Sequence, residues 1–314
     1  MTKKQLSIVV PIFDEERGIR RFLDEHLGPE IEKLDYKFEV ILVDDGSEDR
    51  TVEEIRKSKL FKQKETKLVA FSRNFGKEIA LSAGIRTATG EAIIMIDADG
   101  QHPVEAIPKL IERWEAGAEV VTAIAKKKKT RHKLGSKLFY LMMRAAGYKG
   151  FRPDAMDFRL ISREVADEFN ELTERNRITR GLIDWLGFTQ EFVPVKIRGR
   201  EAGKSTYKRG KLAKLAIDGL ASMSRTPLVI FGYIGAFITL FSGALGLFIL
   251  VQQYILGDPL GLDWAGAVAM SVFDAFLIGL VLISQAITAL YVSQIHTETK
   301  NRPLYVVNKR KSKL

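Results

Sequence analysis

The chain has 314 residues and carries 49 Lys and Arg against 39 Asp and Glu, which gives a formal net charge of +10. It contains no cysteine, so disulfide frameworks, thiol nucleophiles and cysteine-ligated zinc sites are excluded. With 46% hydrophobic and 28% charged residues, it is neither a disordered tail nor a protein embedded entirely in a membrane. The excess of basic residues indicates an anionic partner, such as nucleic acid, lipid headgroups or a phosphorylated substrate.

Apolar runs rich in Val and Ile alternate with helical patterns in the first part of the chain. The runs predict strands at residues 6–13, 38–45, 67–72, 91–99 and 118–125. The stretches between them predict helices at residues 15–33, 48–59, 77–88 and 104–116. Continuous apolar strands between helices are typical of an α/β domain with a mostly parallel, Rossmann-like sheet covered on both faces.

Polar clusters stand at the predicted strand ends. Ligands of parallel sheets bind at the carboxyl ends of the strands, so we expect these clusters to meet at one edge. The clusters are Phe13-Asp14-Glu15, Asp44-Asp45-Gly46-Ser47, Ser72-Arg73-Asn74 and Asp97-Ala98-Asp99.

The spacing of Asp97 and Asp99 at a strand end predicts a site for Mg²⁺ or Mn²⁺, with Gln101 as a neutral oxygen ligand. A single pair of this kind is usually a solvated turn. Here the pair ends a buried strand, and a second acidic cluster ends another, which makes the combination more specific. The chain has no P-loop sequence, so we expect the metal to hold a diphosphate.

Two long apolar runs near the carboxyl terminus predict a transmembrane hairpin. The first, residues 229–251, carries no charge and is long enough, at ~1.5 Å per residue, for a bilayer core of ~30 Å. The second, residues 265–292, is interrupted by Asp274, which would lie either inside the membrane or at its outer edge. A buried hairpin in a soluble core is the weaker alternative, because the first run has no polar face.

The charged flanks set the expected topology and the domain boundaries. Lys and Arg flank both runs but are absent from the connection between them, which places both termini in the cytoplasm. Residues 207–226 read as a basic amphipathic helix, either in the headgroup plane or packed on the domain as a surface helix. The predicted organisation is a cytoplasmic α/β domain (1–206), this helix (207–226), two membrane helices (227–295) and a basic cytoplasmic tail (296–314).

Ordered motifs extend along nearly the whole chain: PIFDEE, VDDGSEDRT, SRNFGKEIALSAG, DADGQHP, DFRLISR, RGLIDWLGF, REAGKSTY and RPLYVV. In this order and spacing, they resemble the inverting family-2 glycosyltransferases of GT-A fold. The branch they resemble is the polyprenyl-phosphate glycosyltransferases of the bactoprenol glucosyltransferase type, and dolichol-phosphate mannose synthases are more distant relatives. One departure is that Phe13 and Asp14 stand where the family usually has Tyr and Asn, which removes a Tyr hydroxyl from base recognition.

The resemblance implies roles for the residues at the matching positions. Asp97 and Asp99, assisted by Gln101, match the motif that holds the donor diphosphate through the divalent metal. Asp157 matches a base or orienting carboxylate, although a structural ion pair with Arg159 is a rival reading. Lys77 would stabilise charge on the departing diphosphate or simply cover its helix. The nucleotide-binding positions are Pro11, Phe13, Glu15, Asp44, Asp45 and Ser47.

The acceptor side is inferred from chemistry as well as resemblance. A polyprenyl phosphate is already an anion at neutral pH, so it needs cations to position it more than a strong base. The basic run 126–137 supplies them, with Arg131, Lys133 and Ser136 as the acceptor residues and Lys126–Lys129 interpreted as a solvated patch. Arg200, Ser205 and Tyr207 match a motif that would close over the donor as a lid and bring Arg200 to the phosphates.

The sequence thus predicts an inverting, metal-dependent enzyme that moves one sugar, best assigned as glucose from UDP-glucose, to undecaprenyl or another polyprenyl phosphate at the cytoplasmic membrane face. The alternatives are a GDP-mannose-dependent mannosyltransferase and a non-catalytic module tethered to the membrane that binds nucleotide or lipid. Membrane lipids are expected partners, and nucleic acid is not. The glycines Gly232, Gly235, Gly243 and Gly246 would also allow close helix contacts, either between copies in a homo-oligomer or only within the hairpin.

Overall fold

The computed structural model describes residues 3–63, 65–126, 154–175, 177–196, 244, 251, 255 and 266–314. The chain divides into two compact units, Met1–Tyr207 with Arg302–Leu314, and Lys208–Asn301. The site lies in the first unit. The predicted amphipathic helix lies outside the described residues, as do the first predicted membrane run apart from Ala244 and Val251 and the four glycines of the expected oligomer contact.

The first unit is built on a mixed, mostly parallel sheet of seven strands in the order β3-β2-β1-β4-β6-β5-β7. Only β6 runs against its neighbours β4 and β5, while the other adjacent pairs are parallel. The strands are β1 (Gln5–Ile12), β2 (Lys37–Asp44), β3 (Thr66–Ala70), β4 (Ala92–Met95), β5 (Val120–Ala125), β6 (Ala155–Ser162) and β7 (Gln190–Val195).

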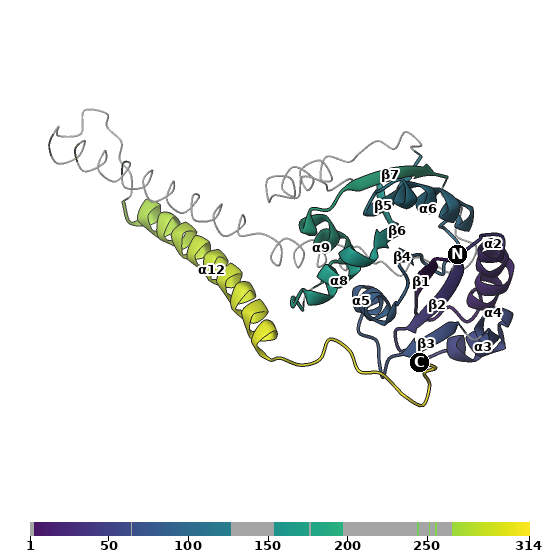
Figure 1. Cartoon of the computed structure of the whole chain (residues 1–314). Coiled ribbons are helices and arrows are strands. Elements are labelled where there is room, and N and C mark those ends of the chain that lie inside the picture. Colours follow the sequence, from purple (N-terminus) through teal and green to yellow (C-terminus); the bar gives the residue numbers. More distant parts are fainter. Residues whose placement is uncertain are drawn as a thin grey trace. The chain divides into compact units, whose positions relative to one another are not determined.

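Helices cover both faces of this sheet, as Figure 1 shows. One face packs against α1 (Ile19–Arg21), η1 (Phe22–Leu27), α2 (Gly28–Glu32), α3 (Thr51–Lys57), α4 (Lys59–Lys62), η2 (Val104–Ala106) and α6 (Ile107–Glu115). The opposite face packs against α5 (Lys77–Thr87), α8 (Arg163–Glu171) and α9 (Thr179–Leu186). Successive strand residues therefore alternate between two cores: Ile8 and Val10 belong to the first and Val9 to the second.

The five predicted strands and four predicted helical stretches are all present, and two strands are additional. The first helical stretch is divided into α1, the π-helical η1 and α2. Pro29 lies in the first turn of α2 and has no amide hydrogen to donate, which is consistent with a break at this point. Strands β6 and β7 were not predicted, because charged residues interrupt the apolar pattern of DFRLISR and β7 contains a proline.

The carboxyl-terminal segment Arg302–Leu314 belongs to the sheet unit. It runs antiparallel to the edge strand β3, with bridges between Phe71 and Val307 and between Leu68 and Lys313, and the chain end lies beside β3 in Figure 1. The sequence indicated only a basic tail here. The segment instead covers the open edge of β3, whose backbone groups would otherwise remain unpaired.

The second unit contains α12 (Gly266–Thr299), which overlaps the second predicted membrane run. Asp274 lies in this helix and is exposed. Within the described parts of the chain, no helix combines the length and the apolar character needed to cross a membrane.

Candidate active site at the carboxyl edge of the sheet

The polar clusters follow the carboxyl ends of β1, β2, β3 and β4, as predicted. The antiparallel strand β6 adds its amino-terminal end to the same edge. Because Met95 of β4 pairs with Arg159 of β6, continuing that register by two residues brings Asp97 opposite Asp157. The sheet itself therefore places a carboxylate from DADGQHP beside one from DFRLISR, although 60 positions separate them in sequence.

Lys77 connects these two carboxylates. It is the first residue of α5, and its Nζ lies 2.7 Å from the Asp97 carboxylate and 2.8 Å from that of Asp157. Burial opposes ionisation of Asp157, but the Lys77 ammonium outweighs it and lowers the Asp157 pKa to about 2. Burial in turn opposes the charge of Lys77, but the two carboxylates outweigh it and raise the Lys77 pKa. Asp157 is therefore ionised at neutral pH, and Lys77 is placed in the site rather than over its own helix.

The rival reading paired Asp157 with Arg159. Among the described residues, the direct ion pair of Asp157 is with Lys77, while Arg159 is only 2% exposed and donates from Nη2 to the Met156 carbonyl at 3.3 Å. Arg159 still contributes its charge to the low Asp157 pKa. It supports the site from within the sheet rather than neutralising Asp157 directly.

His102 is a site residue that the sequence motifs did not predict. It belongs to the loop that follows β4; its side chain is buried, and its Nδ1 accepts the Asp97 backbone N–H at 3.2 Å. Burial lowers the His102 pKa, and the ring stacks on Phe158 with centroids 5.6 Å apart. A neutral His102 thus fixes the backbone at Asp97. The sequence signal for this role is the position of His102, five residues after Asp97 in the loop at the end of the strand.

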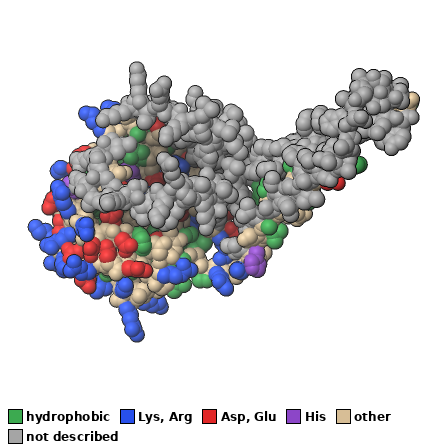
Figure 2. Space-filling model, turned by 180° about the vertical axis from the view of Figure 1, so that it is seen from behind, with side chains coloured by type: hydrophobic (Ala, Val, Ile, Leu, Met, Phe, Trp, Pro, Cys, Tyr) green, Lys and Arg blue, Asp and Glu red, His purple; other side chains and the backbone are tan. Residues whose placement is uncertain are grey.

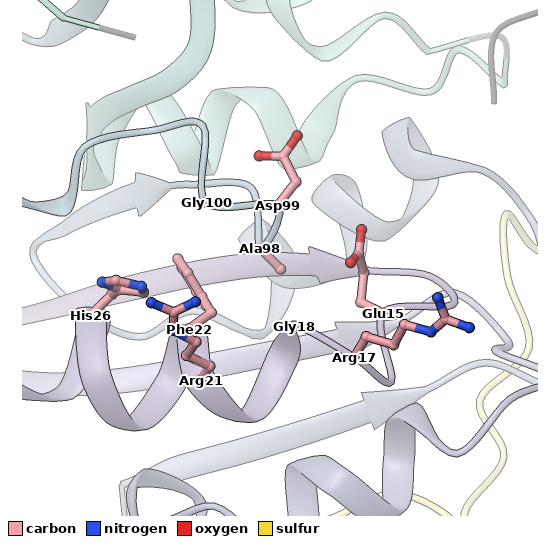
Figure 3. A pocket seen from close by; sticks show the side chains of 9 residues that line it. All are labelled: Glu15, Arg17, Gly18, Arg21, Phe22, His26, Ala98, Asp99 and Gly100. Carbon is pink, nitrogen blue, oxygen red and sulfur yellow. The ribbon is translucent and has the colours of Figure 1, made fainter. Parts of the chain in front are cut away.

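The Asp99 carboxylate lies further along the same loop. Its Oδ1 accepts the Gln101 backbone N–H at 3.0 Å, so this contact involves the Gln101 main chain rather than the predicted side-chain oxygen. Figure 3 shows Asp99 above α1 and η1, on the same side as the Glu15 carboxylate, while Arg21 and His26 line the opposite end of the pocket. Glu15 and Asp99 therefore share one pocket, as the sheet-edge rule predicted.

Asp44 and Asp45 have different environments despite being adjacent. Asp44 is fully buried: its Oδ1 accepts the Ser47 N–H at 3.2 Å, and its Oδ2 has no hydrogen-bond partner among the described residues. Asp45 accepts the N–H groups of Phe75 at 2.7 Å and Gly76 at 2.9 Å, just before α5. One carboxylate oxygen of Asp44 thus lacks a donor, whereas the Asp45 carboxylate fixes the start of α5.

The loop after β1 is joined to the loop after β2 by side-chain hydrogen bonds. Asp14 adopts a left-handed backbone with φ 50°; its N–H donates to the Ser47 hydroxyl at 3.0 Å, and its carboxylate accepts the Glu48 N–H at 3.0 Å. Glu15 N–H donates to Thr51 Oγ1 at 2.8 Å. Asp14 therefore adopts the left-handed backbone conformation that Asn and Asp tolerate better than most residues.

The other two predicted nucleotide residues differ in exposure. Pro11 is buried within β1, where it pairs with Val43, and so acts as part of the sheet. Phe13 is 43% exposed just beyond the strand end, where its ring is open to a flat ligand. The predicted acceptor and lid residues Arg131, Lys133, Ser136, Arg200, Ser205 and Tyr207 lie outside the described residues.

Acidic and basic side chains are unevenly distributed over the described surface. The face seen in Figure 2 carries a group of Asp and Glu side chains with Lys and Arg around it.

Comparison with known proteins agrees with this architecture. Residues 7–169 match the family described as glycosyl transferase family 2. The chain is 36% identical over 315 residues to the bactoprenol glucosyl transferase of Shigella phage SfX, covering 98% of this chain and 100% of that one. It is 34% identical to the prophage bactoprenol glucosyl transferase homolog of Escherichia coli strain K12, covering 98% of this chain and 99% of that one.

A solved structure has the same fold. Glucosyl-3-phosphoglycerate synthase from Mycobacterium tuberculosis superposes with a TM-score of 0.50 at 18% identity, over 70% of this chain and 80% of that one. The mixed α/β sheet is thus of the GT-A type expected from the motifs. The protein belongs to glycosyl transferase family 2.

Proposed function

We propose that this protein transfers one glucosyl residue from UDP-glucose to a polyprenyl phosphate with inversion at the anomeric carbon. The names of relatives that match over nearly their full length support the reaction class, the sugar and the lipid acceptor. The observation that carries the proposal is the group Asp97–Lys77–Asp157, which three elements bring to the ligand-binding edge of the sheet.

The donor nucleotide is assigned to the end of the site near Asp44. The buried Asp44 Oδ2 needs a hydrogen-bond donor, because an unsatisfied buried carboxylate oxygen is costly. The N–H of a uracil base supplies one, and the exposed ring of Phe13 offers a flat surface close to the same strand ends. Asp45 acts on this site indirectly, by holding the Phe75 and Gly76 amides.

A divalent cation, Mg²⁺ or Mn²⁺, is assigned to Asp99, with Asp97 beside it. No group of three acidic, His or Cys side chains poised for a metal occurs among the described residues. Such ions usually take only one or two carboxylates and complete their shell with water and substrate phosphates, so this donor set fits. Asp97 already contacts Lys77, which leaves Asp99 as the principal protein ligand. When bound, the metal supplies positive charge to the departing diphosphate.

The chemistry at Asp157 is electrostatic rather than proton abstraction. A carboxylate with a pKa of about 2 is a weak base at neutral pH, and a phosphate acceptor needs little deprotonation. The phosphate oxygen attacks the anomeric carbon, the bond to the diphosphate breaks, and the electron pair leaves with UDP. Asp157 and Lys77 orient the reacting groups, while Arg131, Lys133, Ser136 and Arg200 are assigned to the phosphates, with Ser205 and Tyr207 in the lid.

The lipid acceptor implies action at a membrane surface. We assign residues 229–251 and 265–292 to a two-span hairpin with both termini on the cytoplasmic side, on the strength of their apolar sequence and basic flanks. Residues Lys208–Asn301 form a unit of their own, consistent with a separate role for this part of the chain.

The test uses the full-length protein with undecaprenyl phosphate, Mg²⁺ or Mn²⁺, and either UDP-glucose or GDP-mannose, with the lipid product identified by mass. We expect a hexosyl lipid from UDP-glucose, and its loss in Asp99→Ala and after removal of divalent ions. Asp35→Ala is the control, because Asp35 is 87% exposed, pairs with Lys3 and precedes β2, at the opposite edge of the sheet. A product only from GDP-mannose would replace the proposed donor, and no lipid product from either donor would refute the function.

A further inference from the structure

The motif RPLYVV, residues 302–307, has no role in the reaction described above. In the structure it begins the carboxyl-terminal segment that lies along β3. Ser72 N–H donates to the Val306 carbonyl at 2.9 Å, and Asn308 N–H donates to the Ala70 carbonyl at 2.8 Å. Further along, the Ser312 hydroxyl accepts the Ala70 N–H at 3.0 Å. The segment is therefore bonded to the carboxyl end of β3, at the edge of the sheet where the site lies.

A continuous series of contacts leads from this segment to the site. The ring of Tyr305 stacks on Phe71, with centroids 4.9 Å apart and planes 20° apart. Phe71 is 1% exposed and meets Phe75 edge to face, with centroids 5.6 Å apart. Phe75 and Gly76 donate their N–H groups to Asp45. The next residue is Lys77, which bridges Asp97 and Asp157.

The position of Lys77 depends on this loop for a physical reason. The amides of Phe75 and Gly76 precede the first turn of α5. Gly76 has φ 105°, which is not a helical conformation, so the helix does not extend back into this loop. The loop must therefore be held by tertiary contacts. On one side these are the two hydrogen bonds to Asp45, and on the other the ring contact of Phe75 with Phe71.

We propose that the carboxyl-terminal segment is a positioning element of the active site, in which Tyr305 acts through Phe71 and Phe75 to hold Lys77 between Asp97 and Asp157. The expected effect on catalysis rests on the proposed function, whereas the effect of Tyr305 on the loop before Lys77 does not depend on it. Tyr305 touches no reacting group and is a positioning residue. The segment after α12 thereby becomes part of the catalytic unit rather than a loose tail.

A purely protective role for the segment makes a different prediction. Covering the edge of β3 requires the backbone pairs at Leu68 and Phe71, and any side chain at position 305 would serve. The positioning role requires an aromatic ring against Phe71. A Tyr305→Phe change preserves the ring and Tyr305→Ala removes it, so the two variants separate these roles.

The control is Tyr36→Ala. Tyr36 is also partly buried and also pairs with a phenylalanine, Phe38, at 6.2 Å, but it precedes β2 and so lies at the opposite edge of the sheet. Each alanine variant loses one contact with a phenylalanine ring, a stacked one at Tyr305 and an edge-to-face one at Tyr36. Any difference between them in the active site therefore comes from location rather than from lost packing.

The experiment measures hydrogen exchange and kcat for the wild type and the three variants, all as the full chain. We expect Tyr305→Ala to accelerate exchange at the amides of Phe75 and Gly76 and to lower kcat about ten-fold, because small misplacements of catalytic groups are costly. Tyr305→Phe should match the wild type, and Tyr36→Ala should change neither readout.

Unchanged exchange at Phe75 and Gly76 in Tyr305→Ala overturns the proposal. Equal loss of kcat in Tyr305→Ala and Tyr36→Ala also overturns it, since general destabilisation would then suffice. A wild type that makes no glucosyl lipid refutes the proposed function instead. In that case the exchange data alone still decide whether Tyr305 holds the loop before Lys77.

Discussion

Replacement of Lys77 by methionine removes the ammonium between Asp97 and Asp157 while keeping an unbranched side chain of similar length. In the native structure Nζ lies 2.7 Å from one carboxylate and 2.8 Å from the other. The two contacted oxygens are therefore separated by at most the sum of these distances, about 5.5 Å. Without the cation, two negative charges face each other across that gap.

The size of the effect follows from Coulomb's law. At ~5.5 Å, two unit charges repel by about 0.8 kcal/mol in bulk water and by about 3 kcal/mol at the effective dielectric of ~20 typical of protein sites. The Lys77 and Asp157 side chains are 36% and 39% exposed, so the true value lies between these limits. If the carboxylates move apart to relieve this repulsion, the reacting groups lose their positions, and kcat falls by about four- to 150-fold.

The assay is steady-state glucosyl transfer to undecaprenyl phosphate at saturating donor, acceptor and divalent ion. Thermal unfolding is followed in parallel to show that the variant is folded. Lys77→Arg, which keeps the charge but presents a planar fork, should retain more activity than Lys77→Met. A folded Lys77→Met enzyme with kcat within two-fold of the wild type would refute the electrostatic role of Lys77.

Two further predictions concern the loops and the base of the sheet. Gly46→Ala should abolish activity and lower the unfolding temperature, because Gly46 has φ +74° and a Cβ there would lie 2.2 Å from the Arg73 carbonyl carbon. Gly117→Ala is the control: Gly117 has φ +106°, but a Cβ there would meet nothing within 4 Å, so only a small loss of stability is expected. Unfolding measured against pH should show a contribution from Glu39, whose hydrogen bonds with Ser7, Thr89 and Lys67 outweigh burial and lower its pKa. Because folding lowers the Glu39 pKa, the ionised Glu39 stabilises the protein above pH ~4.5, and this stabilisation is lost as the pH falls through the pKa of the folded state. Glu39→Gln should therefore reduce the fall of the free energy of unfolding at acid pH. An unchanged fall in the variant would contradict this.

The sequence alone determined the elements of the sheet unit and most residues at its edge. Apolar runs of Val and Ile and the intervening helical patterns are local signals, so the five strands and the helical stretches between them were predictable. The rule that ligands bind at strand carboxyl ends then grouped Asp44, Asp97 and Glu15 correctly, since parallel strands expose these ends on one side. The motifs were specific enough to indicate the family.

Tertiary structure decided what each side chain does at that edge. The antiparallel pairing of β6 with β4 sets Asp157 opposite Asp97, and no local pattern encodes which strands become neighbours. It also assigned Lys77 to both carboxylates and turned Asp45 toward the backbone before α5. The carboxyl-terminal segment is the strongest case, because Tyr305 meets Phe71 across more than 200 positions of chain. Such contacts depend on how distant elements pack, which local sequence signals do not specify.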